Sequence, residues 1–378
     1  MKKFLISLFL GTAVITGTAV FAYSEIKPEA MQLHFVEDAE ERQAVCNDGS
    51  PAAYYLREGS GENKNNWIIQ LEGGASCSSE YDCKNRWVTQ NSLMTSNGLT
   101  RQKPSSGILS GWRFQNPDFH NYNHVKLEYC SSDLWSGNNQ IGYKNLPLQF
   151  RGKVIVDSVI EDLEMHGLKK AENILFSGSS AGGYGMMRNL DDISKQLTWA
   201  DVRGINDSAW SMTYEIGPYN TSFYEDKYGD DFTSIEEDNE SAGEYIHGIW
   251  NEFLDESCVA NFPDTPWDCN NTTKTSEYIE TPYFLYVDQQ DHKHTERLGL
   301  TDFTDPEQKE YLKLYSEIMR ESFEGIDAMF STDRTVHTGL TSSRFNSLIV
   351  DGYTYRDIFT NWYFDQTGPK KVIESVGN

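Results

Sequence analysis

Short apolar runs alternate along this chain with stretches in which apolar residues recur at helical spacing. The apolar runs predict strands at 66–74, 123–130, 174–176, 202–207 and 282–288. Residues 154–166 predict a helix with one apolar face, and Gly167 is available to end it. Strands that alternate with helices imply a mostly parallel sheet with helices on both faces, which is a three-layer α/β sandwich.

One predicted strand runs directly into a tight turn and a helix, in the sequence NILFSGSSAGGYGMMRNL at 173–190. Gly178 and Gly182 flank Ser180 as G-x-S-x-G. On such a sharp turn the serine hydroxyl projects from the top of the sheet, and the helix N-terminus offers unpaired N–H groups where an oxyanion would form. Ser180 is therefore a candidate nucleophile; the alternative is a small-residue turn without chemistry.

The N-terminus reads MKKFLISLFLGTAVITGTAVFA, in which an apolar run follows two lysines and small residues precede the cleavage point. This pattern predicts a secretory signal peptide over 1–22 rather than a retained membrane anchor. No second long apolar run follows, so no membrane anchor is expected in the mature chain. We therefore expect a secreted or periplasmic monomer in which 23–378 form a single catalytic domain.

The exported part contains six cysteines. An even number in an oxidising compartment favours three disulfides over a zinc site, because no two C-x-x-C motifs occur together. Short spacing favours two pairs and leaves the third by elimination: Cys77–Cys83, Cys258–Cys269 and Cys46–Cys130. The domain is thus expected to be braced by disulfides.

The net charge is −25, and −27 once Lys2 and Lys3 leave with the signal peptide. Such a charge argues against nucleic acid and anionic membrane surfaces as partners. Acidic residues concentrate in a segment at roughly 212–257, for which a solvated surface is the simplest interpretation because no EF-hand spacing is present. No metal ion or other cofactor is expected.

An α/β-hydrolase places its catalytic residues in the order serine, acid, histidine. Asp288 ends the second strand after the serine turn and is the predicted acid, while Asp291 in the same VDQQD motif is the alternative. Seven of the eight histidines fail the order or lie too near the acid in sequence: His34, His120, His124, His166, His247, His292 and His294. His337, in the polar loop STDRTVHTGLTSS, remains as the predicted base.

An acyl-transfer site also needs donors for the tetrahedral oxyanion. The N–H of Ala181, directly after the nucleophile, is one candidate. The motif LEGGAS places Gly73, Gly74 and Ala75 in a turn after an earlier strand, where hydrolases of this fold carry further donors.

Six longer motifs stand in a fixed order along the chain: CNDGSPAAYYLREG, WIIQLEGGASC, YCSSDLWSGN, GSSAGGYG, NDSAW and WDC. In this order and at these spacings they resemble the pectin acetylesterase and Notum family of secreted α/β-hydrolases, from near Cys46 to near Trp362. The resemblance implies a nucleophile, an acid, a base and three oxyanion donors at Ser180, Asp288, His337, Gly74, Ala75 and Ala181.

Some positions depart from the family or have two interpretations. Family members usually carry a tryptophan just after the oxyanion glycines, where this chain has Ala75 and Ser76, so the wall of the acyl pocket is expected to differ. Trp135 either stacks on a sugar or covers the core. Asp207, in NDSAW, is expected to shape the loop that faces the pocket.

The features together predict a secreted serine carboxylic-ester hydrolase that removes acyl groups, foremost acetyl, from an O-acylated substrate such as pectin or another glycan. Pectin is a polyanion that this charge repels at low salt, so an uncharged acylated carbohydrate or another small ester fits at least as well. One alternative is a Notum-like deacylase of longer acyl esters. The other is an inactive hydrolase fold that serves as a binding module.

Overall fold

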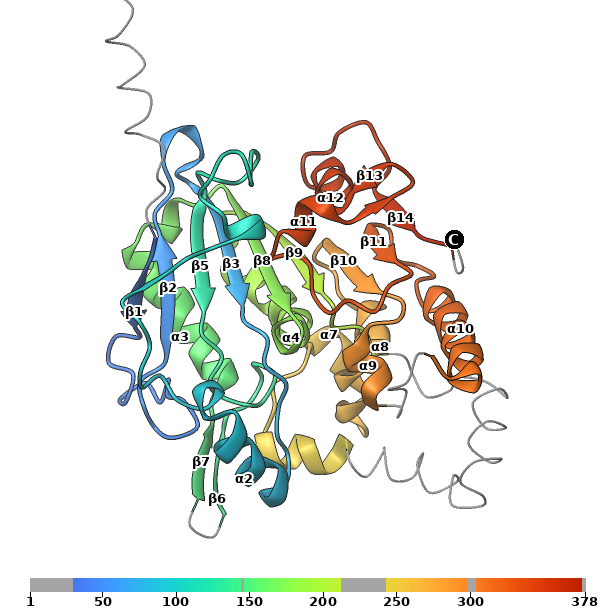
Figure 1. Ribbon diagram of the computed structural model, residues 1–378. Helices are drawn as coiled ribbons and strands as arrows, with labels where there is room; N and C mark the ends of the chain where they lie inside the picture. Colours follow the sequence, from blue (N-terminus) through green and yellow to red (C-terminus); the bar gives the residue numbers. More distant parts are fainter. Residues whose placement is uncertain (1–29, 144–145, 212–242, 298–303, 376–378) are drawn as a thin grey trace, which may run out of the picture.

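The computed structural model describes residues 30–143, 146–211, 243–297 and 304–375. A large twisted sheet forms its centre (Figure 1). The order of the strands across this sheet is β14 (Lys371–Ile373), β11 (Met329–Thr332), β10 (Tyr283–Asp288), β9 (Asp201–Asp207), β8 (Asn173–Ser179), β3 (Asn66–Leu71), β5 (Asn123–Leu127), β2 (Ala53–Arg57), β1 (Met31–Phe35) and β4 (Gln102–Lys103). The strands from β14 to β5 are parallel, whereas β2, β1 and β4 pair antiparallel.

All five predicted strands are present, as β3, β5, β8, β9 and β10. The predicted helix is α3 (Gly152–Met165), and Gly167 follows it with φ 101°, in the left-handed region that glycine adopts at low cost. The serine turn leads from β8 into α4 (Ala181–Gln196). Local apolar periodicity therefore predicted the central elements correctly.

Helices cover both faces of the sheet. Phe176 of β8 packs in the same core cluster as apolar residues of α3 and α4, while its neighbour Leu175 points to the opposite face and packs with α12 (Tyr355–Tyr363). Leu285 of β10 shares the face of Phe176 through the strand registers and packs against α10 (Pro306–Glu321). The predicted three-layer α/β-hydrolase architecture is confirmed.

Shorter elements surround these layers. Further helices in the described ranges include α2 (Glu80–Thr89), α7 (Glu256–Val259), α8 (Thr272–Ser276), α9 (His292–Arg297) and α11 (Arg344–Ser347), and residues 243–250 are also helical. Two antiparallel pairs join β6 (Asn139–Tyr143) to β7 (Leu146–Phe150) and β12 (Ile349–Val350) to β13 (Tyr353–Thr354). No helix in the described ranges has both the length and the apolar character to cross a membrane. The predicted signal peptide lies outside the described residues, as does the acidic segment up to residue 242.

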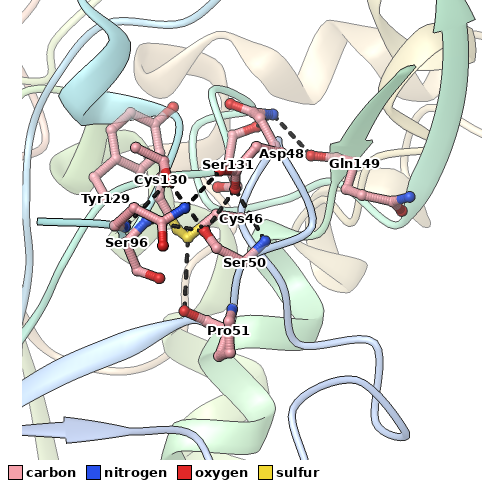
Figure 2. The surroundings of a disulfide bond; sticks show 12 residues. Cys46, Asp48, Ser50, Pro51, Ser96, Tyr129, Cys130, Ser131 and Gln149 are labelled. Atoms are coloured by element: carbon pink, nitrogen blue, oxygen red, sulfur yellow. Dashed lines mark hydrogen bonds between the residues drawn. A yellow bond between two sulfur atoms is a disulfide. The ribbon is translucent and has the colours of Figure 1, made fainter. Parts of the chain in front are cut away.

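Three disulfides brace the domain, and their pairing is the predicted one: Cys46–Cys130, Cys77–Cys83 and Cys258–Cys269. Figure 2 shows the first, which joins a turn near the N-terminus to the segment that follows β5. In that turn the Asp48 carboxylate accepts hydrogen bonds from the Ser50 N–H and hydroxyl. The disulfide thus ties residues that are far apart in sequence at the end of β5.

The carboxyl ends of the parallel strands meet at one edge of the sheet. The glycine turn follows β3, Ser180 follows β8, Asp207 ends β9, Asp288 ends β10, and the loop with His337 follows β11. Because ligands of open α/β sheets bind at this edge, the predicted site residues converge where the fold favours a site.

Candidate active site

Ser180 sits on a strained turn between β8 and α4, with φ 55° and ψ −121°. A Cβ on Gly178 would lie 1.8 Å from the carbonyl oxygen of Gly182, and a Cβ on Gly182 would lie 2.0 Å from that of Leu71. Only glycine fits at both positions, because strand, turn and helix approach so closely. The Ser180 N–H donates to the carbonyl oxygen of Asp207 at 2.8 Å, which helps to hold the turn.

His337 makes a short hydrogen bond to a buried carboxylate. Its Nδ1 donates to Oδ2 of Asp291 at 2.6 Å, and Asp291 is fully buried. A carboxylate in this position selects the imidazole tautomer that carries the proton on Nδ1, so Nε2 is free to accept a proton. The His337 side chain keeps 16% of its surface exposed, so the imidazole remains accessible.

In the structure His337 bonds Asp291 and not the predicted Asp288. Asp288 instead accepts hydrogen bonds from the Val336 N–H at 3.1 Å, the Tyr286 hydroxyl at 3.0 Å and the Thr332 hydroxyl. Tyr286 and Thr332 donate to Oδ1 of Asp288 and Val336 donates to Oδ2, so both carboxylate oxygens have partners. The chain then turns after β10, with the Asp291 N–H donating to the Asp288 carbonyl at 3.1 Å, and this turn brings the second acid of VDQQD to the imidazole.

The sequence contained a signal for Asp291. Its Oδ1 accepts the Lys293 N–H at 2.9 Å, so Asp291 caps the start of α9, and aspartate directly before a helix is a recognised N-cap. The start of α9 was therefore a sequence signal for the carboxylate that contacts His337.

Burial perturbs two other carboxyls at this edge. It raises the pKa of Asp288 to about 7, against the opposing hydrogen bonds from Thr332 and Tyr286, and the nearby Asp291 charge raises it further. Burial likewise raises the pKa of Asp207 to about 6, although its hydrogen bonds lower it.

Two further histidines border His337. The rings of His292 and His294 stand edge-on to it, with centroid distances of 5.9 and 6.2 Å. His292 Nδ1 also contacts the carbonyl oxygen of Thr335 at 2.9 Å, which fastens the loop before His337 to α9. Within the ranges that the structure describes, no group of three or more histidine, cysteine or carboxylate side chains is arranged to hold a metal ion.

The glycine turn after β3 lies against the serine turn. A Cβ on Gly73 would come within 2.9 Å of the Ser180 Cβ, so a side chain there would collide with Ser180. Gly74 has φ 155° and Ala75 has φ 56°. Ala181 is the first residue of α4, so its N–H has no acceptor within the helix. The predicted oxyanion donors therefore belong to segments that adjoin Ser180.

Residues after β5 hold this glycine turn in place through hydrogen bonds to Glu72. The Tyr129 N–H donates to the Glu72 carboxylate at 3.1 Å, and the Trp135 indole N–H donates to the Glu72 carbonyl at 2.9 Å. Trp135 is fully buried, so of its two interpretations the structure selects the core and not a sugar platform. Tyr129 packs at Gly74 and precedes Cys130, so the Cys46–Cys130 disulfide stabilises the support of the turn.

Comparison with known proteins finds one family across almost the whole chain. Residues 24–376 match the family model described as pectinacetylesterase. The palmitoleoyl-protein carboxylesterase notum1a of Danio rerio is 31% identical over 85% of this chain. The palmitoleoyl-protein carboxylesterase NOTUM of Homo sapiens is 34% identical over 68% of this chain. The matches span 63% and 50% of the lengths of these relatives.

A solved structure gives the same picture. The Wnt deacylase Notum from Drosophila superposes with a TM-score of 0.80 at 27% sequence identity, covering 92% of this chain and 96% of that one. The likeness thus extends over nearly the whole of both chains.

Proposed function

Because the chain belongs to the pectinacetylesterase family, we propose that it is a secreted serine carboxylic-ester hydrolase with Ser180 as nucleophile, His337 as base and Asp291 as acid. The observation that carries this proposal is that one edge of the sheet holds both a strained serine turn and a loop whose histidine bonds a buried carboxylate through Nδ1. The relatives are named as carboxylesterases, which supports the assignment to carboxylic-ester hydrolases.

The chemistry follows from these positions. His337 Nε2 takes the Ser180 proton as the hydroxyl oxygen attacks the ester carbonyl, and then gives that proton to the leaving alcohol. Water, deprotonated by the same nitrogen, attacks the acyl-enzyme and releases the acid. Asp291 holds the imidazole in the required tautomer and stabilises its positive charge.

We assign the oxyanion donors to the N–H groups of Gly74, Ala75 and Ala181. The closeness of the glycine turn to Ser180 supports this assignment, as does the position of Ala181 at the N-terminus of α4. Donors of this kind act where charge develops in the transition state, and loss of one typically costs about 10²–10³ in turnover.

The proposed substrate is a short acyl ester, foremost an acetyl group on a carbohydrate. The family description supports an acetyl ester, and the net charge of −25 favours an uncharged glycan over a polyanion at low salt. The second candidate is a longer acyl ester, which the palmitoleoyl-protein carboxylesterases and the Wnt deacylase among the relatives favour.

Hydrolysis of nitrophenyl esters of increasing chain length, together with acetate release from acetylated xylan and acetylated pectin, tests the proposal. We expect acetyl esters to be cleaved fastest, with activity unaffected by EDTA. Ser180→Ala should abolish turnover. Ser158→Ala is the matched control, because this serine is also buried but lies on α3 in the helical layer.

The outcomes separate the candidates. Faster cleavage of long acyl chains than of acetate would assign the protein to the longer-acyl class. A folded wild-type protein that cleaves no ester would refute the hydrolase and leave the binding module. Activity lost with EDTA and restored by zinc would refute the metal-free mechanism.

A further inference from the structure

Three residues other than glycine adopt left-handed backbone where the serine turn meets the histidine loop. They are Ser180 with φ 55°, Ser208 with φ 65° and Thr338 with φ 63°. Strained backbone of this kind persists only where its surroundings hold it, and it clusters at functional sites. The Ser180 N–H donates to the Asp207 carbonyl at 2.8 Å, and the Thr338 N–H donates to the Ser208 hydroxyl oxygen at 3.1 Å. Asp207, the last residue of β9, and the adjacent Ser208 therefore hold the strained residues Ser180 and Thr338 in place.

The Asp207 carboxylate strengthens the same connection. It is fully buried, and its Oδ1 accepts the Gly339 N–H at 2.9 Å. Its Oδ2 accepts the Leu340 N–H at 3.2 Å and the Ser179 hydroxyl at 2.5 Å. Gly339 and Leu340 lie two and three residues after His337, and Ser179 precedes the nucleophile. One carboxylate thus joins the loop of the base to the strand of the nucleophile.

The direction of these hydrogen bonds requires a carboxylate. Gln70 Nε2 donates to the Ser179 hydroxyl oxygen at 3.1 Å, so the serine proton is directed to Asp207. The carboxylate therefore faces three donors, and it has only acceptors to offer. An asparagine would present one acceptor oxygen and one NH₂ group to the same three donors, so at least one backbone N–H of the histidine loop would lose its partner.

We propose that Asp207 is a positioning residue that sets the place of the His337 imidazole relative to the Ser180 hydroxyl. This role rests on the proposed function. Asp207 does not touch the reacting atoms; its side chain acts through the loop 338–340, while its carbonyl oxygen holds Ser180 whatever the side chain.

Steady-state kinetics of Asp207→Asn on a nitrophenyl acetate substrate test the role. We expect kcat to fall by about 10²-fold, as for a displacement of roughly 1 Å in a catalytic group, with little change in KM. In a His337→Ala background the same substitution should cause no further loss, because groups that act as a unit are not additive. A change that merely unfolds part of the protein would lower the residual rate in both backgrounds.

A second variant keeps the test decisive if Asp207→Asn does not fold. Ser208→Ala removes only the acceptor for the Thr338 N–H, and it should lower kcat in the same manner but by a smaller factor. Asp191→Asn is the matched control, because Asp191 is also a buried carboxylate that accepts two backbone N–H groups, from Glu280 and Thr281, both at 2.9 Å. It should lower the melting temperature and leave kcat unchanged.

Near wild-type kcat in folded Asp207→Asn and Ser208→Ala would overturn the proposal, as would an equal loss from Asp207→Asn with and without His337. Failure of the proposed function is distinguishable, because it appears in the wild-type protein as absence of ester hydrolysis before any variant is compared.

Discussion

Replacing Asp291 by asparagine tests whether Asp291 or Asp288 orients the His337 imidazole. The carboxylate is fully buried and accepts the Nδ1 proton at 2.6 Å. If the asparagine turns its NH₂ group to Nδ1, the imidazole must accept there and carry its proton on Nε2. It can then no longer take the proton of Ser180.

The wrong tautomer should lower kcat by up to about 10⁴-fold, which corresponds to about 5 kcal/mol of transition-state stabilisation. Asp288→Asn is the matched comparison, since its side chain bonds the Val336 N–H and not the imidazole. Its loss should be about tenfold or less, the scale of a single hydrogen bond.

The assay is hydrolysis of nitrophenyl acetate by both variants, after circular dichroism has shown that each is folded. Asp291→Asn should also be non-additive with Ser180→Ala and with His337→Ala, because losses from residues that act as one catalytic unit do not add. Near-normal turnover in folded Asp291→Asn, together with a collapse in Asp288→Asn, would refute the reasoning from geometry and return the acid to the end of β10.

Three further predictions concern stability. Burial holds the pKa of Asp288 at about 7 in the folded protein, against an ordinary value of 3.8. The free energy of unfolding that its neutral carboxyl contributes is therefore fully present below about pH 4 and is lost as the pH rises through 7. Urea unfolding should show a smaller loss of stability over this range in Asp288→Asn than in the wild type, and an equal loss would contradict the prediction. Replacing Cys46 and Cys130 by alanine opens a link between residues 84 positions apart and should lower the free energy of unfolding by about 4–5 kcal/mol, whereas an unchanged denaturation midpoint would show that the link contributes nothing. Gly182→Ala should prevent folding or lower the melting temperature sharply, because its Cβ would lie 2.0 Å from the Leu71 carbonyl oxygen; a stable, active variant would show that the turn can relax.

Much of this molecule was determined by local sequence. The strands β3, β8, β9 and β10 and the helix α3 followed from apolar periodicity, because each pattern depends on neighbouring residues alone. The serine turn followed from its flanking glycines for the same reason. The disulfide pairing followed from spacing and elimination, since only six cysteines had to be divided. The elements, the serine turn and the disulfides Cys77–Cys83 and Cys258–Cys269 are all short-range features. Cys46–Cys130 joins residues 84 positions apart and followed only by elimination.

The partner of His337 was decided only by the tertiary structure. Asp288 and Asp291 have the same chemistry and lie three residues apart, so the choice depends on how the turn after β10 meets the loop after β11. The link from Asp207 to that loop spans more than 130 positions and leaves no periodic trace in the sequence. A hydrogen bond between two loops depends on the relative positions of the strand ends from which the loops start. The folded sheet sets those positions by bringing the carboxyl ends of its parallel strands to one edge.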